Sequence, residues 1–457
     1  MVRARPSRCS YAPLVTDPSA TVTDLLQHLI RNACVNDGGA DTGHEERSVD
    51  TLSAFLGTSG LECETYEPEP GRKSLVARIE GTDPNAPSLL LMGHTDVVPV
   101  NEANWRHDPF GGELIDGEVW GRGAVDMLNL TSSMAVAMRR LADSGFRPKG
   151  TLTYLAVADE EALGTHGAKY LVDHERDVIG ADYVITESGG IPIPSTDGIR
   201  LPIMVGEKGC YWCKIIVRGT AGHGSQPWRT DNALVKAAEV VRRIATYQPE
   251  TDINEIWRRF LEGMGLPEEM TSPLLSADTF MDAIEALPIG MGRQFHACTH
   301  TTFSPNIVHG GSKINTIPDT VELEVDIRTL PGQTAEDVEG QLRSALGDLA
   351  DEVTFEASAY DASSSSPIDT PLWDTLSRTS KQFYADSQTV PMLIVGATDA
   401  RFFRSFGATA YGFGLFSRNL AFEDFSKMFH GDDERVDVES LRLSTELWEA
   451  VARDLLG

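Results

Sequence analysis

The sequence predicts an α/β protein, in which a three-layer αβα domain carries a second, α+β domain as an insertion. Three observations support this prediction. Apolar strand-like runs alternate with helix-like segments from Ser74 onward, the strand-like runs lengthen after Val205, and the first texture returns beyond a Ser-rich stretch at 363–366. Alternating strands and helices indicate a sheet covered by helices. An alternation of short strands and helices that stops and later resumes indicates that a second unit is inserted into the first.

The first domain is expected to contain short buried strands whose C-terminal ends carry functional groups, as is usual in α/β sheets. Its strand-like segments are 75–79, 88–92, 151–157 and 183–186, and its helix-like segments are 128–144 and 168–174. Strand character resumes at 392–395 and 409–413, and a helix-like segment closes the chain at 438–456.

The inserted domain is expected to be built on longer strands. Its strand-like segments are 211–217, 321–327 and 353–359, with a helical stretch at 232–247 and a helix-like insertion at 254–287. A Ser-rich linker follows the last of these strands. The first domain is therefore expected to comprise residues 1–206 and 362–457, and the inserted domain residues 207–361.

Composition narrows the classes of partner. The chain has 68 acidic and 39 basic residues and a formal net charge of -29, which repels nucleic-acid phosphates and anionic membrane surfaces. No stretch approaches the roughly 18 consecutive apolar residues of a membrane span. Small molecules are therefore the expected partners, and neither nucleic acid nor a membrane is expected.

The six cysteines show no disulfide-framework spacing, and residues 1–20 read as a loose leader without the apolar run of an export signal. Both observations indicate a cytoplasmic protein. Cys210 and Cys213 form a single C-x-x-C inside a strand-like run. Residues three apart on a strand face opposite ways, so we expect this pair to be structural rather than redox-active or metal-binding.

Ionisable residues follow the strand-like runs of the first domain. They are His94 and Asp96 after the run 89–93, Asp126 after a Gly-rich turn, Glu160 and Glu161 after the run 151–158, Glu187 after the run 184–186, and His430 beyond the insertion. Alternation puts His94 and Asp96 on one side, so the Asp96 carboxylate is expected to orient the imidazole of a metal-binding histidine. Imidazole and carboxylate ligands together suit zinc and also permit cobalt or manganese.

The order of these residues resembles that of the M20 metallopeptidase family, which includes aminoacylases, carboxypeptidases and deacylases, and the resemblance covers nearly the whole chain. It implies a zinc-peptidase-like catalytic domain with an inserted lid or dimerisation domain, and a site for two divalent metal ions. Asp126 would bridge the two ions. His94 and Glu187 would complete the ligands of one ion. Glu161 and His430 would complete those of the other.

The same resemblance implies the catalytic groups. Glu160 would be left free of the metals as the general base, with Asp96 supporting the site. The segment 219–227 resembles the family's signature in the lid domain, in which His223 reaches the site of a partner subunit and stabilises the developing oxyanion. A homodimer is therefore implied. The alternative for His223 is an ordinary surface-loop histidine.

Further resemblances concern recognition of a substrate carboxylate. Asn315, Arg328, Gly396 and Arg401 match segments that the family uses for this purpose. Arg328 offers a planar fork that can hold a carboxylate with two hydrogen bonds, although strand-edge ion pairing is the alternative. Arg401 and Arg404 are alternative clamps that the sequence does not rank. Arg122 is expected only to pair with acids near the site.

The chain departs from the family's pattern directly after the bridging residue. Many relatives carry Lys-Gly after Asp126-Met127, whereas this chain has Leu128-Asn129. The change does not alter the expected metal ligands. It weakens any inference of a particular substrate from the relatives.

The expected activity is metal-dependent cleavage of an amide bond in a small peptide or an N-acyl amino acid that bears a free carboxylate. The alternatives are a biosynthetic deacylase of the acyl-ornithine or succinyl-diaminopimelate type, a related aminopeptidase, and a non-catalytic metal-dependent binding protein. Retention of Glu160 argues against the last, because a non-ligand acid has no evident use in passive binding. The insertion at 254–287 suggests a lid larger than a compact deacylase needs.

Overall fold

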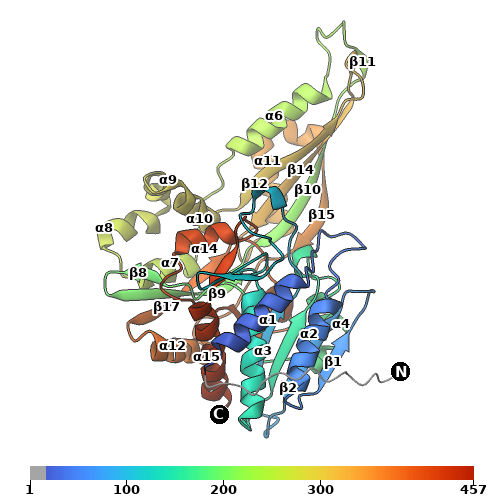
Figure 1. Cartoon of the computed structure of the whole chain (residues 1–457). Helices are drawn as coiled ribbons and strands as arrows, with labels where there is room; N and C mark the ends of the chain where they lie inside the picture. The colour runs from blue at the N-terminus through green and yellow to red at the C-terminus, as the bar shows by residue number, and fades with distance from the viewer. Residues whose placement is uncertain (1–16) are drawn as a thin grey trace.

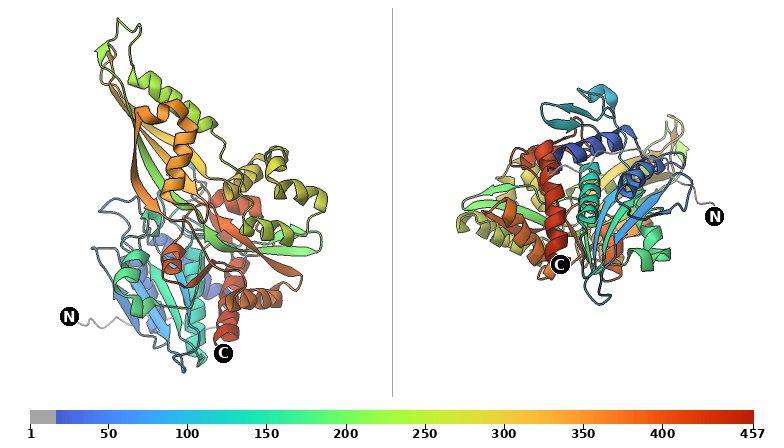
Figure 2. Two further views of the ribbon diagram at one scale, coloured as in Figure 1. Left: turned by 180° about the vertical axis from the view of Figure 1, so that it is seen from behind. Right: turned by 60° about the horizontal axis from the view of Figure 1, so that its bottom comes forward.

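The computed structural model describes residues 17–457, so Cys9 and nearly all of the expected leader at 1–20 lie outside the described residues. Two sheets organise the chain, a large mixed sheet at one end and a four-stranded sheet that extends away from it (Figures 1 and 2). The predicted α/β fold, with helices covering a large sheet and a second sheet beyond it, is confirmed.

The large sheet has the strand order β1-β2-β6-β3-β7-β18-β9-β16, with β8 and β17 also paired to β9. Strand β3 lies between β6 and β7 and runs parallel to both, so that all three end at the same edge. The strands are β1 Cys63–Tyr66, β2 Ser74–Ile79, β3 Leu89–His94, β6 Leu152–Val157, β7 Tyr183–Thr186, β8 Ile193–Ser195, β9 Gly198–Glu207, β16 Ser364–Ser365, β17 Ser387–Ile394 and β18 Thr409–Gly412.

Helices cover both faces of this sheet and give it three layers. One apolar core joins the sheet to α1 Ser19–Arg31, α2 Glu46–Gly57, α3 Leu128–Asp143, α12 Pro371–Phe383, α14 Phe422–Met428 and α15 Val438–Leu456. A second core joins the opposite face to α4 Ala168–His174, α5 Arg176–Ile179 and α13 Ala400–Ser405. Helix α3 approaches β3 so closely that a Cβ on Gly93 would lie 2.4 Å from Thr131 Oγ1.

A small sheet ties the end of the chain to the loop before α3. It consists of β4 Glu113–Ile115, β5 Glu118–Trp120 and β19 Arg435–Asp437, in the order β19-β5-β4. Arg435 lies opposite Trp120 in the antiparallel pairing of β19 with β5. The pairing brings the segment after α14 beside the loop that leads to Asp126, although about three hundred residues separate them in sequence.

The four-stranded antiparallel sheet has the order β12-β14-β10-β15. Its strands are β10 Gly209–Arg218, β12 Thr302–Gly310, β14 Thr320–Thr329 and β15 Val353–Asp361, and α6 Ala233–Thr246 and α11 Ala335–Leu346 cover one face. The chain changes sheets between β9 and β10 and returns between β15 and β16. These two changes lie beside the expected domain boundaries, which stay a proposal.

The helical insertion packs on the large sheet and not on the four-stranded one. It forms α7 Glu255–Gly263, α8 Glu268–Thr271 and α9 Ala277–Glu285, and α10 Ile289–Thr299 follows it. Trp257 and Phe260 of α7 share an apolar core with Val390 and Met392 of β17. Helix α7 therefore adds to the wall of the large sheet, because its apolar face meets β17. The expected domain boundaries include this segment in the inserted domain.

The five cysteines within residues 17–457 are free thiols. Cys213 is part of the apolar core under α6 and α11, and Cys210, three residues earlier on β10, is also buried but lies outside that core. Among the same residues, no helix has both the length and the apolar character that crossing a membrane requires.

Candidate metal centre

Three parallel strands bring one histidine and three glutamates of the candidate site to one edge of the large sheet. His94 is the last residue of β3 and lies opposite Val157, the last residue of β6. The turn that holds Glu160 and Glu161 follows β6, and Glu187 follows the last residue of β7. Because parallel strands end at a common edge, residues far apart in sequence meet here.

Asp126 lies between two imidazoles. Its Oδ1 is 3.2 Å from His94 Nε2, and its Oδ2 is 3.4 Å from His430 Nε2. His430 Nε2 is also 3.2 Å from Glu161 Oε2. Each carboxylate oxygen of Asp126 thus faces a different histidine, which is the placement that a bridging ligand needs.

Two groups of side chains present donor atoms close enough to share an ion. The donor atoms of His94, Asp126 and Glu161 lie within 4.8 Å of one another, as do those of His94, Glu160 and Glu187. The structure therefore brings together all six residues that the sequence singled out for the metal centre. Glu160 lies as near to His94 as the expected ligands do, so its separate role stays a prediction.

The carboxylates of the centre are crowded in a poorly solvated space. Burial raises the pKa values of Glu160, Glu161 and Glu187, and neighbouring carboxylates raise them further. Hydrogen bonds to Asp126 and Glu161 raise the pKa of His430 to about 10. These shifts mean that the cluster retains protons to offset its negative charge.

The donor set fits divalent metal ions. Two imidazoles and several carboxylates converge, and within residues 17–457 the ion pairs of Asp126 and Glu161 are with histidines. Such a cluster is costly to bury unless positive charge compensates it. Glu161 Oε1 is buried and has no hydrogen-bond partner among the described residues. A metal ion would satisfy that oxygen and replace the retained protons.

Asp96 supports the centre differently from the expectation. His94 Nδ1 is 2.9 Å from the backbone carbonyl of Asp96 and 3.6 Å from its carboxylate. The carboxylate instead accepts hydrogen bonds from the backbone N–H groups of Glu160 at 3.2 Å and Glu161 at 3.0 Å. The Asp96 carbonyl therefore orients the imidazole and its carboxylate fixes the glutamate turn, because β3 and β6 are adjacent.

Glu434 is a supporting residue that the sequence analysis missed. Its fully buried carboxylate accepts hydrogen bonds from the backbone N–H groups of Val125 at 2.6 Å and Asp126 at 2.9 Å. It also accepts one from Arg122 Nη1 at 2.8 Å, so the acid with which Arg122 pairs is Glu434. This ion pair fixes the loop that presents Asp126.

Three residues of the centre have left-handed backbone conformations, which side chains with a Cβ seldom adopt. Their φ values are 70° at Asp159, 68° at Ser188 and 55° at His430. Asp159 is held by the backbone N–H of His166, which donates to its Oδ2 at 2.9 Å. Local strain of this kind persists where surrounding contacts fix the chain, as at functional sites.

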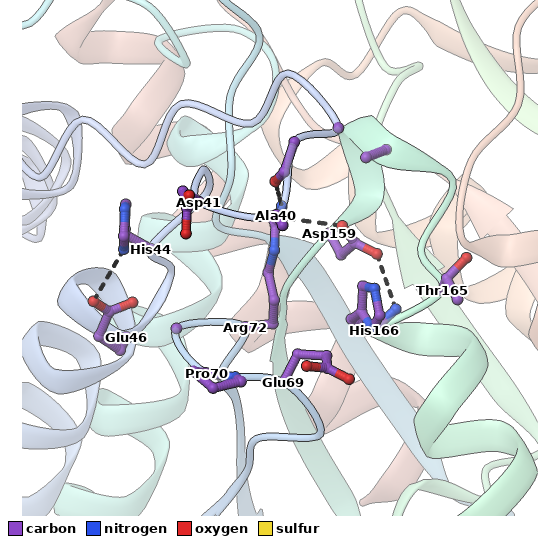
Figure 3. A pocket seen from close by; sticks show the side chains of 14 residues that line it. Ala40, Asp41, His44, Glu46, Glu69, Pro70, Arg72, Asp159, Thr165 and His166 are labelled. Atoms are coloured by element: carbon purple, nitrogen blue, oxygen red, sulfur yellow. Dashed lines mark hydrogen bonds and ion pairs between the residues drawn. The ribbon is translucent and has the colours of Figure 1, made fainter.

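A cavity of about 730 Å³ lies behind the glutamate turn, with Asp159 in its wall (Figure 3). Arg72 lies between Asp159 and the side of the cavity that holds His44 and Glu46. Its Nη1 is 2.8 Å from Glu45 Oε1 and 3.6 Å from Asp159 Oδ1. Arg72 thus supports the turn from the side opposite the metal centre.

Two predicted site residues lie far from the centre within one chain. His223 is exposed in the two-stranded ribbon of β11 Gly222–His223 and β13 Thr316–Ile317. Figure 1 places β11 at the end of the four-stranded domain that is farthest from the large sheet. Asn315 lies beside it, since its carbonyl accepts a hydrogen bond from Gly224 N at 2.8 Å.

The remaining predicted substrate residues differ in their availability. Arg328 pairs with Asp326 through Nε at 2.8 Å. Gly396 lines a cavity that also contains the metal-centre residues. Arg401 Nη1 and Nη2 donate to the carbonyls of Thr398 at 2.6 Å and Leu163 at 2.9 Å.

Arg404 is not a substrate clamp. Its side chain is 4% exposed and its Nη1 lies 2.7 Å from Glu207 Oε1. Its Nη2 donates to the carbonyl of Ala410 at 2.9 Å. The guanidinium therefore connects α13 to the sheet. The sequence could not reveal this contact, because Glu207 lies about two hundred residues away.

Asp399 is a second residue whose importance the sequence analysis missed. It is 2% exposed, and neither carboxylate oxygen has a hydrogen-bond partner among the described residues. Burial raises the pKa of Asp399 to about 7, and the nearby Arg401 opposes that rise. The motif that contains both residues marked this loop, but only the fold shows that the carboxylate is unpaired.

Replacing Glu434 with Gln tests the support of the Asp126 loop. The substitution leaves the Arg122 charge buried without its partner, so we expect the free energy of unfolding to fall by about 3–5 kcal/mol. Urea unfolding measures it. In the control Asp351→Asn, the ion pair with Arg343 is lost from a side chain that is 95% exposed, and the expected loss is below about 1 kcal/mol. Equal losses in the two variants would contradict this role for Glu434.

Known proteins resemble this chain over most of its length. Aminoacylase-1B of Rattus norvegicus is 28% identical over 399 residues, covering 86% of this chain and 87% of the relative. A probable carboxypeptidase S-like protein of Dictyostelium discoideum is 26% identical over 395 residues, covering 81% of this chain and 72% of the relative. The crystal structure of an M20 family metallo-carboxypeptidase from Sulfolobus solfataricus shares the fold, with a TM-score of 0.67, 17% identity, and coverage of 95% of this chain and 98% of that one.

The model of peptidase family M20/M25/M40 matches residues 90–454. The matched segment includes the ends of β3, β6 and β7, the loop before α3 and the segment after α14, and so includes every residue of the candidate metal centre. The chain therefore belongs, as a hydrolase, to peptidase family M20/M25/M40.

Proposed function

We propose that this protein is a two-metal amidohydrolase that cleaves the amide bond of a small peptide or an N-acyl amino acid bearing a free carboxylate. The observation that carries the proposal is the position of Asp126, whose two oxygens face His94 and His430 at 3.2 and 3.4 Å. Zinc is the expected metal, because it accepts mixed imidazole and carboxylate ligands, and cobalt or manganese could replace it.

The proposed ligand sets follow the family pattern. Asp126 would contribute to holding both ions, and His94 and Glu187 would complete the ligands of the first. Glu161 and His430 complete those of the second, a pairing supported by the 3.2 Å distance between their side chains. When bound, the two ions polarise the amide carbonyl and lower the pKa of an attacking water.

Glu160 is proposed to move the proton. It takes a proton from the water that attacks the amide carbonyl and delivers it to the leaving nitrogen, so that the products are a carboxylic acid and an amine. The raised pKa of Glu160, which burial causes, suits a group that must hold a proton between these two steps. Asp96 keeps the turn in place by accepting the N–H of Glu160 at 3.2 Å.

Recognition of the substrate carboxylate is proposed to involve Arg328 and Asn315, whereas Gly396 lines the cavity beside the metal centre and is proposed to contact another part of the substrate. Arg328 is favoured over Arg401 because its side chain is 26% exposed against 7% for Arg401, and because both Nη atoms of Arg401 already donate to backbone carbonyls. Asn315 lies at the distal tip with His223, so both could act only in the site of a second copy. We therefore propose a homodimer in which His223 of the partner subunit stabilises the oxyanion.

The metal and the substrate class are tested together. Chelator-treated protein is expected to lose amine release from N-acyl amino acids and dipeptides, and zinc or cobalt is expected to restore it. Amidating the carboxylate of each substrate is expected to lower kcat/KM about tenfold or more, because a hydrogen bond to a charged group is lost. Activity that survives chelation, or that ignores amidation, would contradict the proposal.

Replacing Glu160 with Gln is expected to lower kcat by about 10²–10⁴-fold while the metal content stays unchanged. Turnover of N-acyl amino acids and elemental analysis measure the two quantities. The matched variant Glu161→Gln is expected to lose metal, since Glu161 is a proposed ligand. Loss of metal from Glu160→Gln would instead assign that residue to the ligands.

Mixing two inactive variants tests the dimer. His223→Ala and Glu160→Gln are each expected to be nearly inactive as pure dimers. Coexpression would give mixed dimers in about half of the molecules, each with one complete site, and so about a quarter of the normal activity. Activity no higher than that of either pure variant would contradict a site completed by the partner.

A further inference from the structure

An apolar cavity of about 360 Å³ opens beside the metal centre. At one end it contains the metal-centre carboxylates and His430. Its other walls come from β17, α14 and the neighbouring part of β9. Its volume is that of a small-molecule site, for which about 300–1,000 Å³ is usual.

The walls away from the metal centre are dominated by apolar side chains. They include Met204, Met392, Leu393, Val395, Phe422 and Phe429. Among the described lining residues, the only charged groups are those of the metal centre, and Gln294 and Ser188 are examples of the few uncharged polar ones. The part of the cavity away from the metal centre therefore favours an uncharged, apolar ligand group.

We propose that this cavity binds the acyl group of the substrate, and that the protein acts on N-acyl amino acids with acyl chains larger and more apolar than acetyl. The inference rests on the proposed function. It assigns the acyl side because Arg328, the favoured carboxylate ligand, belongs to β14 of the four-stranded sheet and does not line the cavity. With the scissile carbonyl at the metals, the acyl chain then extends away from that sheet.

The cavity favours longer chains for a physical reason. Burying a methylene contributes about 0.8 kcal/mol, which corresponds to about a fourfold gain in kcat/KM for each added CH₂. Methionine side chains are flexible and adapt to ligands of different shape. Met204 and Met392 therefore let the cavity accept straight or aromatic acyl groups, whereas an acetyl group leaves the apolar walls in contact with water.

Two isomers separate the acyl side from the amino-acid side. N-hexanoylglycine and N-acetylnorleucine have the same composition and carry their apolar chain on opposite sides of the scissile bond. Metal-loaded full-length protein is expected to cleave N-hexanoylglycine with the higher kcat/KM. Across N-acetyl-, N-butanoyl- and N-hexanoylglycine, kcat/KM is expected to rise about fourfold per CH₂.

A preference for N-acetylnorleucine, or a flat response to acyl length, would overturn this inference and leave the proposed amidohydrolase intact. Absence of cleavage for all N-acyl amino acids and dipeptides would overturn the proposed function itself. The two failures are therefore distinguishable in one panel.

A variant that fills the cavity gives an independent readout. Val395 is half-buried in the cavity wall, and Val395→Trp is expected to bring the N-hexanoyl to N-acetyl ratio of kcat/KM close to one. The control Leu114→Trp changes a side chain that is 50% exposed on β4, and its ratio is expected to match the unchanged protein. Because the ratio is taken within each variant, differences in folded fraction or metal content cancel. An unchanged ratio in Val395→Trp would overturn the inference.

Discussion

The crowding of carboxylates around Asp126 is the constraint on which the rest of the structure depends. Negative groups from the ends of β6 and β7 meet at one edge of the sheet beside two imidazoles, those of His94 and His430. Such a cluster is costly to enclose without positive charge. Divalent ions would provide that charge, and they would also stabilise the folded protein, since the ligand geometry exists only when the strands are assembled.

Much of the surrounding polar structure keeps these carboxylates in place. Asp96 holds the glutamate turn from the inside and Arg72 supports it from behind, while Glu434 fixes the loop that ends in Asp126. Asp96 and Glu434 accept hydrogen bonds from backbone N–H groups, and Arg72 pairs with Glu45 and Asp159. These contacts fix the positions of the proposed ligands, and the groups that make them are not proposed as ligands. The left-handed residue Asp159 is tolerated because contacts on both sides of the turn define its conformation.

The arrangement of the two sheets separates the chemical tasks. Ligands and the proposed base belong to the large-sheet domain, whereas His223 and Asn315 belong to the distal tip of the four-stranded domain (Figure 1). The helical insertion joins the former, because α7 packs on β17. The domain with the proposed metal ligands thus also provides the apolar cavity, and the other domain provides the proposed contacts to the carboxylate and oxyanion.

The sequence alone indicated the α/β class, because short buried strands that end in acids or histidines are visible as local patterns. The resemblance of their order to a known family then indicated the family and the six residues that meet at the candidate metal centre. His94, Glu160 and Glu187 could be found as local patterns, since His94 ends one strand and each glutamate follows another. Pairings between distant segments were decided only by the tertiary structure. Glu434 reaches the Asp126 loop through the pairing of β19 with β5. Arg404 forms an ion pair with Glu207, and helix α7 of the insertion packs against β17. A linear sequence shows which side chains carry charge or apolar area, but the partner of a buried charge or an apolar face is fixed by packing across hundreds of residues.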